Sequence, residues 1–204
     1  MRFNKQVTKL FSIALATLIL NVLCIQIVDI PFSALIARNL GIYAPHLKTT
    51  QIPDFLLITV VILTSISWIM YFYLVRQNIH NQRTLFYRVM GTVLPFSFCI
   101  KTILKWAFGR IETRTWLADQ SLYGFHWFAG SEGFEGFPSG HMLVFTSMFL
   151  TFWHFYPRYR TVYGLGLFCL GIALIAAEYH FLGDVFAGVY IGTIVYLSTI
   201  RIVR

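Results

Sequence analysis

The strongest constraint on the fold is a series of long apolar runs without a charged residue. Residues 10–28 form one run of 19 residues, and residues 55–75 form a second of 21. A helix of about 20 residues spans the hydrocarbon core of a bilayer. In the whole chain 57% of the residues are hydrophobic and 12% are charged, whereas soluble domains carry roughly 25% charged residues. The composition therefore predicts a membrane protein and excludes a soluble domain, a disordered chain and a coiled coil.

The apolar runs predict an all-α fold, an integral membrane bundle of six transmembrane helices. The helices are expected at residues 10–28, 55–75, 86–107, 139–156, 161–177 and 180–200. A cleaved signal peptide is the alternative for the first run, but the run is long for a signal and no small-x-small cleavage site follows it. We therefore interpret it as the first spanning helix.

One further segment predicts a short interfacial helix in addition to the six spans. In residues 31–47, Phe32, Leu35, Ile36 and Leu40 recur at helical spacing beside the charged Arg38. Such an amphipathic pattern is typical of a helix that lies at the membrane surface. We expect one membrane domain over residues 1–204, with the first helix and this segment in 1–53 and the core in 54–204.

The basic residues predict the orientation of the chain in the membrane. With six spans, one side carries 10 Lys and Arg residues and no acidic residue, and the other carries 6 together with all 8 Asp and Glu residues. The positive-inside rule makes the first side cytoplasmic. We expect a bacterial inner-membrane protein with both termini in the cytoplasm. The net charge is +8, and most of the basic residues flank apolar runs. The bilayer is therefore the expected partner, and nucleic acid is not.

Three polar clusters are predicted to lie at one membrane depth on the non-cytoplasmic face, where ionisable residues suggest a functional site. They are Lys105 with Arg110, then Ser139, Gly140 and His141, and finally Glu178, His180 and Asp184. Taken singly, the clusters fit plainer interpretations, such as snorkelling anchors or helix caps. Only a shared site explains why they converge.

The residue types in these clusters suit phosphoryl transfer without a metal. A helix N-terminus binds phosphate through its free N–H groups, and Lys105 and Arg110 add matching donors. His180 can act as a nucleophile if Asp184, one helical turn away, holds its second ring nitrogen. His141 can then protonate the leaving oxygen.

Two other classes of membrane protein could carry polar residues of these types. A metal-dependent hydrolase would use His180, Asp184, His141 and Glu178 as ligands. A transporter is disfavoured, because its ionisable residues are expected near the middle of spans, whereas here they cluster at helix ends.

The motifs resemble those of the type-2 phosphatidic acid phosphatase superfamily from about residue 55 to the C-terminus. Pro138-Ser139-Gly140-His141 is similar to the central motif, His180-x-x-x-Asp184 to the end of the third, and Lys105 through Gly109-Arg110 to the first. The resemblance implies a phosphohistidine at His180, oriented by Asp184, with His141 as general acid. Lys105, Arg110, Ser139 and Gly140 would hold the phosphate, with no metal or other cofactor.

The same resemblance implies an integral-membrane phosphatase that hydrolyses a lipid phosphate monoester or diphosphate at the periplasmic or outer face. A lipid phosphotransferase using the same residues is the alternative. The chain departs from the family pattern at Glu112-Thr113, where Arg-Pro is usual, and at Ala173-Leu174, where Ser-Arg is usual. A phosphate-binding arginine is thus missing, and Arg114 and Lys101 are the candidates to replace it.

Overall fold

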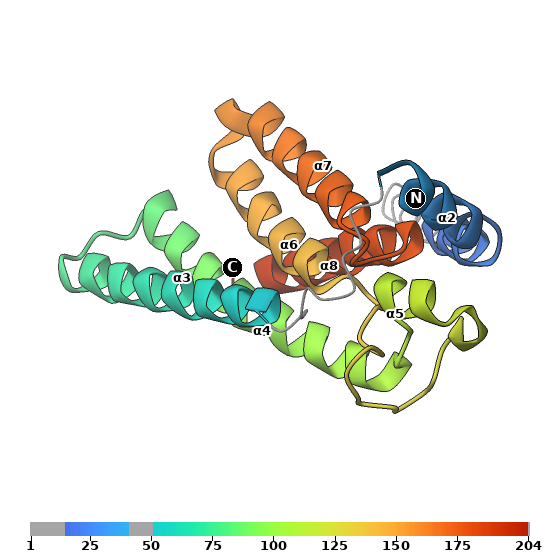
Figure 1. Cartoon of the computed structure of the whole chain (residues 1–204). Helices are drawn as coiled ribbons and strands as arrows, with labels where there is room; N and C mark the ends of the chain where they lie inside the picture. Colours follow the sequence, from blue (N-terminus) through green and yellow to red (C-terminus); the bar gives the residue numbers. More distant parts are fainter. Residues whose placement is uncertain (1–14, 41–50, 204) are drawn as a thin grey trace, which may run out of the picture.

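The computed structural model describes residues 15–40 and 51–203, and these form helices joined by short connections (Figure 1). The helices are Leu15–Leu40, which contains the π-helical turn η1 (Cys24–Val28) and ends as α2 (Asp29–Leu40), then α3 (Gln51–Arg76), α4 (Gln82–Phe108), α5 (Thr113–Ala118), η2 (Gln120–Leu122), α6 (Gly140–Phe155), η3 (Pro157–Tyr159), α7 (Arg160–Ala176) and α8 (Leu182–Val203). The prediction of an all-α fold is confirmed for this part of the chain.

Five of the described helices are long and apolar enough to cross a membrane. They are Leu15–Leu40, Phe55–Arg76, Gln82–Phe108, Pro157–Ala176 and Leu182–Val203. The expected fourth span corresponds to α6, which has 16 residues. This helix is short, and α4, α7 and α8 all pack against it. The structure therefore supports a membrane protein with five candidate spans, and the sixth stays a prediction.

The first helix differs from the sequence-based expectation. We expected a break after residue 28 and a separate interfacial helix over 31–47, but the described helix continues through Pro31 to Leu40. Pro31 has no N–H to donate to the preceding turn of the helix. That turn is η1, in which the regular α-helical hydrogen-bond pattern is already interrupted, so the helix continues through the proline. The rest of the expected helix, residues 41–47, lies outside the described residues, and the expected boundary near residue 53 follows soon after them.

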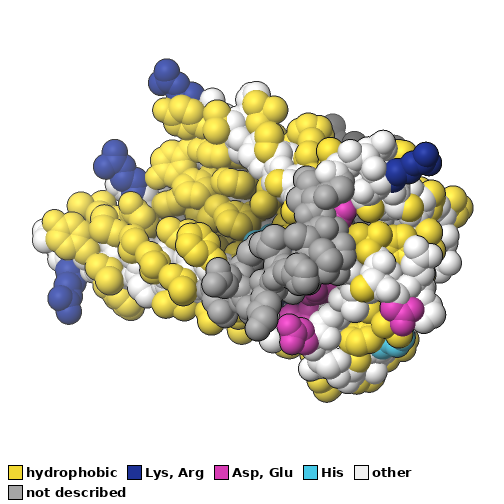
Figure 2. All heavy atoms as spheres, in the orientation of Figure 1, with side chains coloured by type: hydrophobic (Ala, Val, Ile, Leu, Met, Phe, Trp, Pro, Cys, Tyr) yellow, Lys and Arg dark blue, Asp and Glu magenta, His cyan; other side chains and the backbone are white. Residues whose placement is uncertain are grey.

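Apolar side chains cover the outer surface of the bundle, which suits a lipid environment. Phe55, Ile69 and Phe168 are 73%, 66% and 65% exposed, and Figure 2 shows hydrophobic side chains over most of the visible face. In α2 the two buried residues are the polar Asp29 and Ser33. Since lipid solvates apolar groups, the polar face of such a helix turns toward the protein.

Two glycines bring α8 into close contact with α6. A Cβ atom on Gly188 would lie 2.7 Å from the Ser139 carbonyl oxygen, and one on Gly192 would lie 2.5 Å from the Leu143 carbonyl oxygen. Small residues at this spacing let helix backbones approach closely in membranes. This contact sets the N-terminus of α6 beside the N-terminus of α8, where two of the three polar clusters begin.

Candidate active site

A folded connection between α4 and α6 builds one wall of the site. Helix α4 ends at Gly109, whose φ of +51° is unfavourable for other residues. The chain then runs beside two later stretches of the same connection: Arg110 forms an isolated bridge with Phe125, and the Gly136 N–H donates to the Arg110 carbonyl at 2.8 Å. A Cβ atom on Gly136 would lie 2.5 Å from the Ile111 carbonyl oxygen, so this close approach requires glycine.

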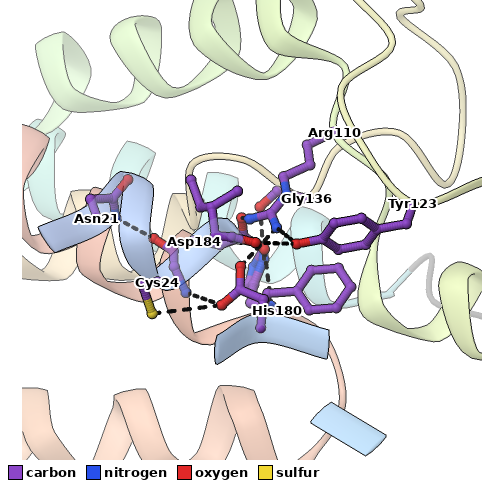
Figure 3. A network of polar contacts seen from close by, with 11 residues as sticks. Asn21, Cys24, Arg110, Tyr123, Gly136, His180 and Asp184 are labelled. Carbon is purple, nitrogen blue, oxygen red and sulfur yellow. Dashed lines mark hydrogen bonds and ion pairs between the residues drawn. The ribbon is translucent and has the colours of Figure 1, made fainter. Parts of the chain in front are cut away.

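The structure brings the three predicted polar clusters together. The Ser139 N–H donates to the Asp184 carbonyl at 3.0 Å, joining the second cluster to the third. The Arg110 guanidinium forms an ion pair with the Asp184 carboxylate, joining the first to the third. Figure 3 shows Arg110, Gly136, His180 and Asp184 converging from separate segments.

His180 lies in the connection before α8, and its side chain is buried. Its Nδ1 lies 3.0 Å from the Gly136 carbonyl oxygen, which can only accept, so Nδ1 carries the proton. Burial, the positive charge of Lys105 and the nearby His141 hold the pKa of His180 well below its ordinary value. With the proton on Nδ1, the lone pair lies on Nε2, and the lowered pKa favours this neutral form.

Asp184 was expected to hold the second nitrogen of His180, and the structure gives that hydrogen bond to Gly136. Asp184 Oδ2 lies 4.0 Å from His180 Nδ1, near enough for electrostatic stabilisation but beyond hydrogen-bond length. The same oxygen accepts from the Phe181 N–H at 2.9 Å. Asp184 thus accepts from the residue directly before α8, and this residue follows His180 in the chain.

Arg110, expected to bind phosphate, is fully buried among protein groups. Its Nη1 donates to Asp184, and its Nη2 donates to Asp29 at 2.7 Å and to the Tyr123 hydroxyl at 2.9 Å. The Phe181 ring centre lies 4.8 Å from the guanidinium carbon. These contacts direct Arg110 toward Asp184 and the first helix.

The phosphate-binding candidates on α6 and α4 lie close to one another. The Ser139 hydroxyl caps α6 by accepting from the Met142 N–H at 3.5 Å, and the N–H groups of Gly140 and His141, at the start of the helix, have no partner within it. A Cβ atom on Gly140 would lie 2.9 Å from Lys101 Cγ, so the stem of Lys101 runs against this N-terminus. His141 interacts electrostatically with both Lys101 and Lys105.

Lys105 and Arg114 have other partners on this side of the molecule. Lys105 Nζ lies 3.7 Å from Glu135 Oε2, whose side chain is half exposed, and such pairs contribute little. Arg114 donates twice to the Ala177 carbonyl, at 2.7 and 3.1 Å, and its guanidinium carbon lies 3.8 Å from the Tyr179 ring centre. Arg114 therefore braces the connection before His180, whereas Lys101 lies beside Gly140.

Glu178, the remaining residue of the third cluster, is buried, and neither carboxylate oxygen has a hydrogen-bond partner among the described residues. Burial raises the pKa of Glu178, while Arg114 acts in the opposite direction. Within residues 15–40 and 51–203, no group of three or more His, Cys, Asp and Glu side chains could hold a metal ion. The four ligands of the metal-hydrolase alternative are thus not gathered into such a group.

The comparison with protein families decides the identity. The model of the PAP2 superfamily matches residues 86–204. The chain belongs to the PAP2 superfamily. The search of curated proteins and the search of solved structures each returned no match. PAP2 proteins are generally phosphatases, so the family and the apolar helices together indicate a membrane phosphatase.

In this PAP2 protein the matched region contains all three polar clusters, but the first helix lies outside it. Two contributors to the site were missed by the sequence analysis, the carbonyl of Gly136 and the side chain of Asp29. A backbone carbonyl leaves no signal in a sequence. Asp29 did leave one, because an acidic residue directly after an apolar run of 19 residues is costly in a membrane unless it has a partner.

Proposed function

We propose that this PAP2 protein hydrolyses a lipid phosphate monoester or diphosphate through a phosphohistidine at His180. The observation that carries the proposal is the contact of His180 Nδ1 with the Gly136 carbonyl oxygen, 3.0 Å away. This contact places the proton on Nδ1 and the lone pair on Nε2, and burial, which lowers the pKa of His180, acts in the same direction. The N-terminus of α6, Lys101 and Lys105 lie in the same region and suit an anionic substrate.

The reaction takes two steps. In the first, His180 Nε2 forms a bond to phosphorus while the bond from phosphorus to the lipid oxygen breaks, and His141 gives its proton to that oxygen. In the second, the water oxygen forms a bond to phosphorus while the bond from phosphorus to His180 Nε2 breaks, His141 takes a proton from the water, and inorganic phosphate leaves. Asp184, 4.0 Å from Nδ1, stabilises the positive charge that develops on the imidazole.

Lys105, Ser139 and Gly140 hold the phosphate in this proposal, and Lys101 supplies the positive charge of the missing arginine. Its stem lies against Gly140, and its side chain is 91% buried, beside the Phe98 ring. For Arg110 the contacts favour an indirect role, because its Nη atoms donate to Asp184, Asp29 and Tyr123. We therefore propose that Arg110 fixes Asp184 and does not contact the substrate.

The proposed site opens to the periplasm or outer leaflet, with both termini in the cytoplasm of a bacterial inner-membrane protein. The asymmetry of basic residues in the sequence supports this orientation. On the face in Figure 2, most Lys and Arg side chains lie at one end of the molecule, and the acidic side chains lie in the other half. The site would therefore receive lipids whose phosphate groups lie at the outer surface.

Phosphate release from a panel of purified lipid phosphates in detergent, with and without a strong chelator, tests the function. We expect release to persist in chelator, because the cations of the site are lysines. Vanadate should inhibit, since it can mimic a pentacoordinate phosphorus bonded to His180. Loss of activity in chelator, restored by zinc or magnesium, would support the metal hydrolase instead. A phosphorylated lipid product without free phosphate would identify a phosphotransferase.

Lys101→Met should lower kcat/KM on lipid phosphates by about 100-fold, because a charge-assisted hydrogen bond to phosphate contributes roughly 1.5–3 kcal/mol. Arg114→Met is the matched control, since it removes one positive charge from the same side of the molecule. Its loss should stay below about tenfold, because Arg114 contacts Ala177 and Tyr179. A larger loss in Arg114→Met than in Lys101→Met would assign the replacement role to Arg114.

A further inference from the structure

Asp29 is a fully buried carboxylate that the first helix contributes to the site from outside the family-matched region. Its Oδ1 accepts from the Gly183 N–H at 2.8 Å, and its Oδ2 accepts from Arg110 Nη2 at 2.7 Å. The contact from Cys24 Sγ to Oδ1 is longer, at 3.8 Å. Asp29 therefore joins the first helix to both Arg110 and the start of α8.

The N-terminus of α8 depends on this carboxylate. Phe181, directly before the helix, has no side-chain oxygen with which to cap it. Asp184 accepts from the Phe181 N–H, and Asp29 accepts from the Gly183 N–H. The two carboxylates thus accept from the residue directly before α8 and from a residue in its first turn, and they complement the positive end of its dipole. His180 lies two residues before this terminus.

The first helix packs closely against Gly183, which has no side chain in the way. A Cβ atom there would lie 2.7 Å from Ile25 Cγ1 and 2.8 Å from Asp29 Oδ2. A second, neutral contact ties the same two segments, because Asn21 Nδ2 donates to the Gly183 carbonyl at 2.8 Å (Figure 3). The close approach is therefore built into the start of α8 as well as into the first helix.

Arg110 lies between two buried carboxylates, Asp29 and Asp184, and donates to both. Losing one partner of a buried ion pair is costly. Without the charge of Asp29, Arg110 keeps the Asp184 carboxylate and the Tyr123 hydroxyl as acceptors but loses its ion pair with the first helix. Asp184 in turn accepts from the N–H of Phe181, the residue that follows His180.

We propose that Asp29 is a positioning residue of the active site, acting through Arg110 and Gly183 to set His180 and Asp184 for reaction. The first helix then serves the reaction as well as the membrane anchorage. This inference rests on the proposed function at His180, and it extends the site beyond residues 86–204, which the family model matches.

The test compares Asp29→Asn with Asn21→Ala in the full chain. Asp29→Asn keeps an acceptor for the Gly183 N–H and removes the negative charge that pairs Arg110 with the first helix, whereas Asn21→Ala removes only the neutral contact from the same helix. We expect kcat, normalised to the fraction of protein that binds vanadate, to fall on the order of 100-fold in Asp29→Asn with KM within about threefold. Asn21→Ala should keep kcat within about threefold.

Wild-type kcat in Asp29→Asn, or an equal loss in both variants, would overturn the proposal, since the second result would reflect only helix attachment. If Asp29→Asn does not yield a monodisperse protein, the kcat of Asp29→Glu tests the proposal in its place. It keeps the charge but is one methylene longer, so kcat should fall about tenfold at constant KM, and wild-type kcat would overturn the proposal. A wild-type protein that releases no phosphate from any lipid would instead refute the proposed function before variants are compared.

Discussion

His180→Ala should lose phosphate release from every substrate, by at least about 10⁴-fold, because no covalent intermediate can form without the nucleophile. The loss should not depend on the leaving group, since the missing bond is the one to phosphorus. Initial rates on a lipid phosphate and on nitrophenyl phosphate measure both cases. Acid-labile labelling of the protein by a radioactive phosphate substrate should disappear in the same variant.

Two further variants distinguish the loss of the nucleophile from a folding defect. His180→Asn keeps a donor for the Gly136 carbonyl and should be as inactive as His180→Ala, although it restores that contact. His126→Ala removes a histidine of the connection between α4 and α6 whose ring contacts Leu122 and Phe134, and should retain activity within about threefold. A phosphoryl label found on His141 would refute the assignment of the nucleophile.

His141→Ala should lower phosphate release from a lipid phosphate by about 10²–10³-fold, because a lipid alkoxide leaves poorly without a proton. With nitrophenyl phosphate the loss should be below about tenfold, because nitrophenolate departs unassisted. The ratio of kcat/KM for the two substrates, measured in the wild type and the variant, gives the effect directly. The position of His141 at the start of α6, beside Ser139 and Gly140, motivates this role.

The opposite pattern would make His141 the nucleophile and His180 the general acid. It would be seen if His180→Ala kept activity on nitrophenyl phosphate while His141→Ala lost activity on all substrates. An equal loss on both substrates in His141→Ala would instead point to a role in phosphate binding, in keeping with its electrostatic interaction with Lys101 and Lys105.

The charged network around Arg110 explains how a polar site is kept at the end of an apolar bundle. Arg110, Asp29 and Asp184 are fully buried, and the guanidinium forms an ion pair with each carboxylate. Lys101 and Lys105 have no such compensation from Asp29 or Asp184, and their positive charges act on His141. The site thus separates two carboxylates that are paired with Arg110 from a region of positive charge suited to a phosphate.

By itself the sequence determined the membrane class, the all-α fold, the family and the identity of the residues that converge. Apolar run length is a local property, and α3, α4, α7 and α8 follow the predicted ranges within a few residues. The motifs around Ser139 and His180 are local as well, and the asymmetry of charge predicted that the clusters share one face. These features can be predicted without knowing which residues contact one another in the folded protein.

Only the tertiary structure decided which partner each polar group takes. The bond from Gly183 to Asp29 joins residues 154 positions apart, and the bond from His180 to Gly136 uses a backbone carbonyl. The continuous first helix, the burial of Arg110 and the separation of Lys101 from Arg114 arise in the same way. Each follows from how helices pack in three dimensions, and residue type and local spacing do not encode that choice.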